Sequence, residues 1–304
     1  MSRSSEAGLA AGLRGAGFRG SLRSEGPLAP HTTWRIGGPA ELLARPGDRD
    51  DLLLAVAWAV DQGVPWRVLG NGSNLLVRDE GVRGLVIRTR KVLDDVQHDG
   101  RHLTAGAGAS FPAVARRAAV LGLSGLEFGA GVPGTIGGAV VMNAGWHEYE
   151  IGSVVEHVEF LEPDGAVRRF DHDDCAFGYR RSCFRGRPGV VLGATLGLEP
   201  GDGAAIGARL EHYASSRKTN QPTELPSCGS VFLKPDGDFA GRLIEQAGLK
   251  GLRVGDVQVS PKHANFFVNL GGGTAADVLA LVERVEREVE TKLGVHLVRE
   301  FELW

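Results

Sequence analysis

The spacing of apolar residues changes along this chain, and each region predicts a different kind of element. Between residues 40 and 90 the pattern alternates between helix and strand, and the apolar run 52–60 has acidic residues before it and Gly63 after it, as a helix does. From 151 to 199 apolar residues recur at every second position, which predicts antiparallel strands. The segment 274–294 places its apolar residues on one helical face.

Shorter elements complete the pattern. Pro112 suits the first turn of a helix over roughly 112–121, and two more helices are expected near 204–216 and 239–247. The last segment, 295–304, reads as a strand. Helices and strands are therefore mixed along the chain.

The length of 304 residues exceeds that of one typical hydrophobic core. We expect two or three domains, with a joint at the Gly-Asp-Gly of 201–203. The arginines within 1–26 are diluted by Glu6 and Glu25, so this segment is expected to be a solvated or partly ordered tail.

The composition excludes several classes of protein. Hydrophobic residues make up 42% of the chain and charged residues 23%, and the net charge of −3 gives no general attraction to nucleic acid or to an anionic membrane. No segment reads as a secretory signal or as a membrane span. The cysteines are odd in number and lack metal-ligand spacing, which favours a reduced, cytoplasmic protein without a metal site; they are Cys175, Cys183 and Cys228.

Glycine is concentrated in 125–145, which holds seven of these residues. Consecutive backbone N–H groups on a glycine-rich loop form a concavity that binds anions, phosphate above all. A smaller loop of the same kind stands at 69–77, so the two loops together suggest a phosphate ligand held from two sides, as a dinucleotide would be. The G-x-G-x-x-G at 129–134 is not read as a nicotinamide-dinucleotide fingerprint, because Pro133 and the following residues oppose immediate entry into a helix.

Three further stretches carry polar residues, and each has an ordinary structural reading when taken alone. Arg180 and Arg181 read as a surface pair, Ser230 as a structural serine between two prolines, and Glu300 as an exposed carboxylate near the end of the chain. No G-x-S-x-G elbow is present, which argues against an acyl-transfer hydrolase.

Taken jointly, these stretches resemble the bacterial UDP-N-acetylenolpyruvoylglucosamine reductases, flavoenzymes of peptidoglycan synthesis. The resemblance runs from about residue 30 to residue 302 through eight collinear motifs. These motifs are TTWRIGGPA (32–40), LGNGSNLLV (69–77), the glycine-rich segment 125–145, GYRRSCF (178–184), QPTELPSCGSVF (221–232), AGRLIEQAGLKG (240–251), VSPKHANFFVN (259–269) and the dipeptide at 299–300.

The resemblance implies an α+β fold, with a two-lobed FAD-binding domain of the vanillyl-alcohol-oxidase (PCMH) type and a C-terminal α/β substrate-binding domain. The expected boundaries are a tail at 1–26, FAD-binding lobes at 27–90 and 91–200, and a substrate-binding domain at 201–304. By position, the residues expected to hold FAD without a covalent bond are Gly70, Asn71, Gly72, Ser73, Asn74, Gly134, Thr135, Gly137, Gly138 and Ala139.

The resemblance also implies a reaction. NADPH would reduce FAD and leave, and UDP-N-acetylglucosamine enolpyruvate would then enter and be reduced to UDP-N-acetylmuramate. Arg180 would stabilise the negative charge that develops on the substrate carboxylate, Glu300 would hydrogen-bond to it, and Ser230 would deliver the proton to C2. The sugar nucleotide is expected to contact Tyr179, Arg217 and Lys234.

Some positions depart from the family pattern. Lys234 stands where asparagine is common, and Trp146 is bulkier than the usual residue and could narrow the entrance. The C-terminal domain has no extra tyrosine-bearing loop, which points to the shorter (type II) subtype, and a monomer is expected.

Two alternative functions stay open. One is an FAD oxidase that uses oxygen, with a flavin tethered through His31, His102 or His147, and the other is an inactive nucleotide-binding protein.

Overall fold

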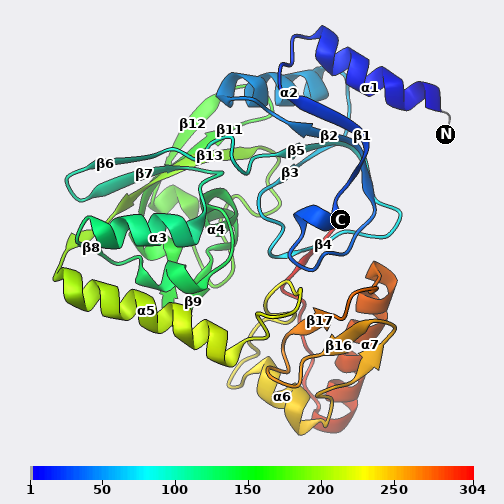
Figure 1. Ribbon diagram of the computed structural model, residues 1–304, viewed down its shortest axis with the longest axis vertical. Helices are drawn as coiled ribbons and strands as arrows, with labels where there is room; N and C mark the ends of the chain where they lie inside the picture. The colour runs from blue at the N-terminus through cyan, green and yellow to red at the C-terminus, as the bar shows by residue number, and fades with distance from the viewer. Residues whose placement is uncertain (1–2) are drawn as a thin grey trace. The chain divides into compact units, whose positions relative to one another are not determined.

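The computed structural model describes residues 3–304, with side chains from residue 8 onward, and divides into two compact units (Figure 1). The first unit consists of the chain up to Glu25 together with Glu41–Asn71 and Arg83–Ser216. The second consists of Gly26–Ala40, Gly72–Val82 and Arg217–Trp304. This division differs from the boundaries expected from the sequence, because two short segments from the N-terminal third belong with the C-terminal part.

The two larger sheets lie mainly in the first unit. The smaller has the strand order β1-β2-β5-β3, and its strands β3 and β5 are parallel, with Leu69 opposite Arg88. The strand bounds are β1 Ser21–Pro27, β2 Pro39–Arg45, β3 Trp66–Leu69 and β5 Val82–Arg88. Helix α2 (Arg49–Asp61) covers the apolar run expected to be helical, and the carboxylate of Asp48 caps it by accepting from the N–H of Asp51.

The larger sheet has the order β12-β11-β13-β7-β6, and all of its pairs are antiparallel. Its strands are β6 Val96–Asp99, β7 His102–Gly106, β11 Val155–Leu161, β12 Val167–Asp171 and β13 Val190–Gly197. The antiparallel strands predicted within 151–199 are therefore confirmed. Strand β13 is buried along almost its whole length, which explains why its sequence is apolar throughout rather than alternating.

Helices and short strands surround this sheet. Helix α3 (Phe111–Val120) matches the expected helix, with Pro112 in its first turn, and α4 (Ile136–Met142) lies within the glycine-rich segment. Helix α5 (Gly203–Asn220) has its last turn in the second unit. The remaining short elements of this part are β8 Leu123–Ser124, η2 Glu127–Gly131, β9 Gly145–Trp146, β10 Tyr149–Glu150, η3 Ile151–Val154, η4 Asp173–Cys175 and β14 Glu199–Pro200.

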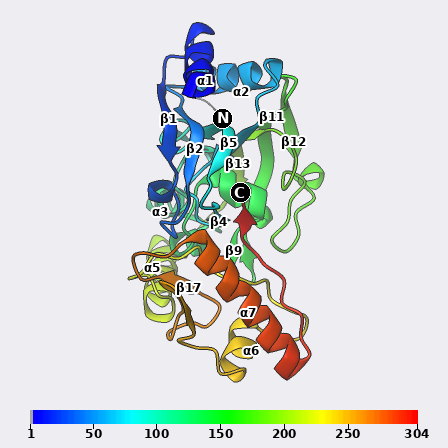
Figure 2. The same cartoon turned by 90° about the vertical axis from the view of Figure 1, so that its right-hand side faces the viewer.

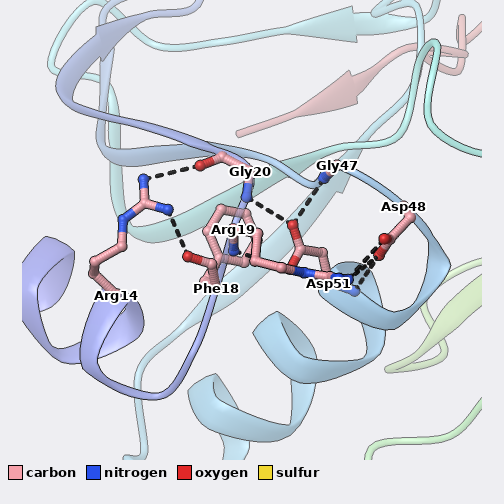
Figure 3. Close-up of polar contacts among 7 residues, drawn as sticks. All are labelled: Arg14, Phe18, Arg19, Gly20, Gly47, Asp48 and Asp51. Atoms are coloured by element: carbon pink, nitrogen blue, oxygen red, sulfur yellow. Dashed lines mark hydrogen bonds and ion pairs between the residues drawn. The ribbon is translucent and has the colours of Figure 1, made fainter.

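The N-terminal segment is structured, so the expectation of a solvated tail is wrong for its described residues. Helix α1 spans Arg3–Gly15, and Leu13 and Phe18 are buried in the core of the first unit. The side chain of Asp51 is 1% exposed and accepts hydrogen bonds from the backbone N–H groups of Arg19, Gly20 and Gly47 (Figure 3). The arginines of this segment suggested a solvated tail, but its apolar residues anchor it to the core.

The second unit has its own core, in which Trp34 is fully buried and packs edge-on against Phe301. The indole N–H of Trp34 donates to the carbonyl oxygen of Phe267 at 2.7 Å. Figure 2 shows helix α7 (Ala275–Leu293) running alongside the strands of this unit. The other elements are η1 Ala29–His31, β4 Leu75–Leu76, α6 Ala240–Gln246, β15 Arg253–Val254, β16 Val257–Val259, β17 Phe267–Asn269 and β18 Glu302–Leu303.

Helix α7 confirms the helical pattern read from its sequence. Thr274 caps it, and its side chain and that of Asp277 accept reciprocally from each other's backbone N–H. The strand expected at 295–304 is confirmed only at Glu302–Leu303, which pairs with β4. Before this pair the chain forms single backbone bridges rather than a continuous ladder, as between Phe232 and Arg299. No helix in the described part of the chain is long and apolar enough to cross a bilayer.

Candidate functional site

The two glycine loops meet within the first unit. Thr135 caps helix α4, and its Oγ1 accepts from the N–H of Gly138 at 3.3 Å. Gly70 lies so close to this cap that a Cβ added to it would stand 2.7 Å from Thr135 Oγ1. The backbone of the 69–77 loop thus approaches the first turn of α4, which is the arrangement that one ligand held from two sides requires.

Not all of the glycines in 125–145 are explained by a ligand. A Cβ on Gly129 would stand 2.7 Å from the ring of Phe111, and one on Gly131 would stand 2.6 Å from the ring of Trp146. A Cβ on Gly137 would stand 2.9 Å from Ala107 Cβ, so these three glycines are required by packing. At Gly138 the nearest atom is Thr135 Oγ1 at 3.5 Å, an ordinary contact, so packing does not explain that glycine.

The second half of the 69–77 loop belongs to the second unit. Gly72 has a left-handed φ of 58°, and a Cβ there would stand 2.4 Å from the carbonyl oxygen of His31. The carbonyl oxygen of Gly72 accepts from the N–H of Thr33 at 3.0 Å. Asn74 donates through Nδ2 to the carbonyl oxygen of Glu300 at 3.2 Å, so the loop is tied to the end of the chain.

Arg88 was not singled out in the sequence analysis. Its surroundings provide one test of whether this part of the first unit fits FAD. Arg88 ends β5 opposite Leu69, the first residue of the 69–77 loop, and its Nε is buried without a hydrogen-bond partner among the described residues. Burial, reinforced by the positive charges of Arg45 and Arg90, lowers the pKa of Arg88 from its ordinary value. A partly buried cation whose Nε has no acceptor among the described residues, beside a loop of backbone donors, fits an anionic group such as the FAD diphosphate. The signal in the sequence that could have identified Arg88 is a charged residue at the end of an apolar strand.

Arg180 lies in a tight turn of the first unit rather than in an extended segment. Gly178 and Arg181 exchange backbone hydrogen bonds at 2.9 Å, and Arg180 between them has a left-handed φ of 52°. Its guanidinium is 5.0 Å from the ring centroid of Tyr179, and Nη1 is 3.5 Å from Glu150 Oε1. The side chain of Arg180 is 18% exposed, whereas Arg181 is exposed, so only the first of the two arginines is held in place.

Ser230 and Glu300 come from two segments that pair within the second unit. The N–H of Glu300 donates to the carbonyl oxygen of Val231 at 2.8 Å, and the N–H of Leu233 donates to that of Val298 at 2.8 Å. The backbone therefore brings residues far apart in sequence side by side. Burial, and after it the charge of Glu300, raises the pKa of the Cys228 thiol well above its ordinary value, so this cysteine stays protonated and is a poor nucleophile.

The remaining expected substrate contacts lie in the second unit. Arg217, in the last turn of α5, has a buried Nε without a hydrogen-bond partner in the described part of the chain, and burial lowers its pKa. Lys234 places its ammonium 4.7 Å from the ring centroid of Phe239, an exposed aromatic residue. Phe239 was not singled out in the sequence, although an apolar ring among polar neighbours was a visible signal.

Two family models match this chain. Residues 40–171 match the FAD binding domain, and residues 221–304 match the UDP-N-acetylenolpyruvoylglucosamine reductase, C-terminal domain. The chain is 50% identical to the UDP-N-acetylenolpyruvoylglucosamine reductase of Rubrobacter xylanophilus over 272 residues, which covers 89% of this chain and 91% of that relative. It is 47% identical to the enzyme of the same name from Moorella thermoacetica, over 97% of both chains.

A solved structure agrees with these matches. The crystal structure of the UDP-N-acetylenolpyruvylglucosamine reductase from Thermus caldophilus aligns with a TM-score of 0.79 at 40% identity, covering 94% of this chain and 99% of that one. The fold and the paired loops define a flavoprotein with an FAD-binding domain. The match to the C-terminal domain and the relatives aligned over most of their length identify one family within this class of flavoproteins. The chain belongs to the UDP-N-acetylenolpyruvoylglucosamine reductase family.

Proposed function

We propose that this protein reduces UDP-N-acetylglucosamine enolpyruvate to UDP-N-acetylmuramate with NADPH, a cytoplasmic step of peptidoglycan synthesis. The proposal is carried by the relatives of that name, which are 47–50% identical to this chain and match it over nearly its full length. The proposal is also supported by the backbone hydrogen bonds that fix the expected catalytic residues, Arg180 in the first unit and Glu300 in the second.

FAD, when bound, supplies the redox chemistry by accepting a hydride from NADPH and returning it to C3 of the enolpyruvyl double bond. The approach of Gly70 to the α4 cap supports a place for the diphosphate there, with Arg88 as the nearby cation. The residues expected to line the diphosphate site are Gly70, Asn71, Gly72, Ser73, Asn74, Gly134, Thr135, Gly137, Gly138 and Ala139. The N–H groups of Gly137 and Ala139 already donate to the carbonyl oxygens of Ala107 and Thr135, so the donors to the diphosphate would come from the other residues of this set.

Arg180 would bind the carboxylate of the enolpyruvyl group. A guanidinium carries a positive charge and presents paired N–H donors that match a carboxylate. As the double bond is reduced, negative charge spreads from C2 onto the carboxylate oxygens, and a fixed cation stabilises that charge more strongly than it stabilises the ground state. The turn that fixes the Arg180 backbone is consistent with such a preorganised cation.

Ser230 would donate its hydroxyl proton to C2, and Glu300 would hydrogen-bond to the charged substrate. A serine hydroxyl is a weak acid, but a carbanion-like C2 is a strong base, so the proton transfer runs downhill. The backbone pairing of Val231 with Glu300 supports a shared task, because it holds the two segments together. The sugar nucleotide would contact Tyr179, Arg217 and Lys234.

We also infer that the protein is of the shorter subtype and acts as a monomer. The chain has three tyrosines, Tyr149, Tyr179 and Tyr213, so the region 221–304 that matches the C-terminal domain has none. A stopped-flow spectrum of the FAD-loaded protein, recorded without oxygen, tests the function. NADPH should bleach the flavin, and UDP-N-acetylglucosamine enolpyruvate should restore the oxidised spectrum.

Four results would contradict the proposed function or its non-covalent cofactor. Bleaching by NADPH without recovery on adding the sugar nucleotide would leave a flavoprotein with another substrate. Recovery with oxygen alone would favour the oxidase, and flavin that stays with the denatured protein would indicate a covalent tether. A protein that binds no FAD would exclude the entire mechanism.

A further inference from the structure

The guanidinium of Arg180 lies against a second, connected set of polar groups that no assigned role uses. Glu150, at the end of β10, places Oε1 3.5 Å from Arg180 Nη1. The carbonyl oxygen of Gly145, in the paired strand β9, accepts from Arg180 Nη2 at 3.3 Å. All of these residues belong to the first unit, so the arrangement is defined within one compact body.

Glu150 is itself fixed by Asn143. The Nδ2 of Asn143 donates to Glu150 Oε2 at 2.7 Å and to the carbonyl oxygen of Gly178, in the Arg180 turn, at 3.0 Å. Its Oδ1 accepts from the N–H of Gly152 at 2.8 Å. Asn143 is buried and adopts a left-handed conformation at the end of α4, so it links the helix, the β9–β10 hairpin and the turn rigidly.

The backbone of Arg180 is strained. A left-handed φ at a residue other than glycine persists only where the surroundings enforce it, and such residues concentrate at active sites. Arg185 adds a restraint by donating through Nη1 to the carbonyl oxygen of Arg180 at 3.1 Å. The backbone is therefore fixed by the turn and by Arg185, while the guanidinium is oriented by Glu150 and Gly145.

The charge on Glu150 requires an explanation. A glutamine could accept the same hydrogen bond from Asn143 without the cost of a half-buried carboxylate. Burial raises the pKa of Glu150 from its ordinary value, with Arg180 and then Asn143 acting in the opposite direction. Arg180 is therefore the charged neighbour that gives a carboxylate an advantage over an amide at this position.

We propose that Glu150 is a positioning residue that, together with Asn143, orients the Arg180 guanidinium for the carboxylate of the substrate. The inference rests on the proposed function, because it assigns Glu150 a role through Arg180. The contacts of 3.3 and 3.5 Å are longer than the ~2.7–2.9 Å of strong charge-assisted hydrogen bonds, so a substrate carboxylate can compete for the same donors.

The test is Glu150→Gln in the FAD-loaded protein, with the exposed Glu148 of the same hairpin changed to Gln as a matched control. Each half-reaction is followed by stopped-flow absorbance without oxygen. We expect reduction by NADPH to stay within about twofold of wild type, and reoxidation at saturating sugar nucleotide to slow about 10- to 100-fold, as misorientation of a catalytic group does. Glu150→Asp, which keeps the charge on a shorter side chain, should recover part of the rate, and Glu148→Gln should match wild type.

A double-mutant cycle distinguishes positioning from independent action. In an Arg180→Lys background, Glu150→Gln should slow reoxidation less than about threefold, because two residues that act through one contact are not additive. Equal losses in both backgrounds, or wild-type reoxidation in Glu150→Gln, would overturn the inference. A wild-type protein that NADPH reduces but the sugar nucleotide does not reoxidise would instead overturn the proposed function before any variant is compared. The flavin spectrum and the thermal midpoint of each variant verify that it is folded.

Discussion

Gly70 and Thr135, which are distant in sequence, lie against each other at the start of helix α4, and a Cβ on Gly70 would stand 2.7 Å from Thr135 Oγ1. This contact joins the two glycine loops that the sequence offers as phosphate-binding segments. The distance is as short as those at which Gly129, Gly131 and Gly137 would meet protein atoms, so glycine at position 70 is what allows the two loops to approach each other.

The first prediction concerns this contact. Gly70→Ala should push the loop away from the α4 cap and weaken FAD binding at least tenfold, measured by flavin fluorescence titration of the apoprotein. Gly207→Ala is the control, because Gly207 lies in α5 with no atom within 4 Å of an added Cβ, and alanine favours a helix. FAD affinity unchanged in Gly70→Ala would remove this contact from the cofactor site.

The second prediction concerns Arg88. Burial of the Arg88 guanidinium has a desolvation cost, and its Nε has no hydrogen-bond partner in the described part of the chain, so Arg88→Met should leave the apoprotein as stable as wild type or more stable. The same variant should bind FAD about tenfold more weakly and with a smaller salt dependence, because one charged contact is lost. Arg83→Met, at an exposed position of the same strand, should change neither property. A variant that loses stability but retains FAD affinity would assign Arg88 a structural role.

The third prediction separates the two half-reactions. In Ser230→Ala, NADPH should still reduce the flavin, while reoxidation by the enolpyruvyl sugar nucleotide should slow about 10²- to 10⁴-fold for loss of the proton donor. Ser227→Ala, in the same loop, is the control. Reoxidation near the wild-type rate would show that Ser230 is not the donor. Glu300→Gln should impair the same half-reaction, and a loss confined to reduction by NADPH would exclude its assigned role.

The fourth prediction concerns stability and pH. Burial opposes the ionisation of Asp51, but the backbone N–H donors of Arg19, Gly47 and Gly20 and the Arg19 guanidinium outweigh burial and hold its pKa below the ordinary value. Asp51→Asn should destabilise the protein by about 2–3 kcal/mol at pH 7, since an amide N–H would replace an acceptor of buried donors. Urea denaturation at pH 7 measures this difference.

The pH dependence follows from the direction of the Asp51 shift. A pKa lowered by folding gives stability that is complete above the unfolded value of about 3.9 and is lost as the pH falls through the folded value. The difference between wild type and Asp51→Asn should therefore shrink when the measurement is repeated below pH 4. Asp50→Asn, at an exposed position of the same helical turn, should show neither effect. A difference independent of pH would mean that the charge of Asp51 is not what stabilises the fold.

The sequence by itself determined the features that depend on neighbouring residues. The one-faced pattern of α7, the alternation in 151–199, the acidic start of α2 and the two glycine loops are local, and the structure contains each of them. The collinear motifs also identified the family, because they record chemistry residue by residue.

Only the tertiary structure decided which distant residues meet. Packing between segments that are far apart in sequence produces three features that no local pattern predicts. They are the burial of Leu13 and Phe18, the Arg88 Nε that lacks a partner among the described residues, and the contact of Glu150 with Arg180. The strand expected at 295–304 was mostly replaced by single bridges, because pairing depends on the partner segment as well as on alternation. A local pattern sets the preferred conformation of a segment, whereas burial, strain and unmet hydrogen bonds exist only once the other segments are in place.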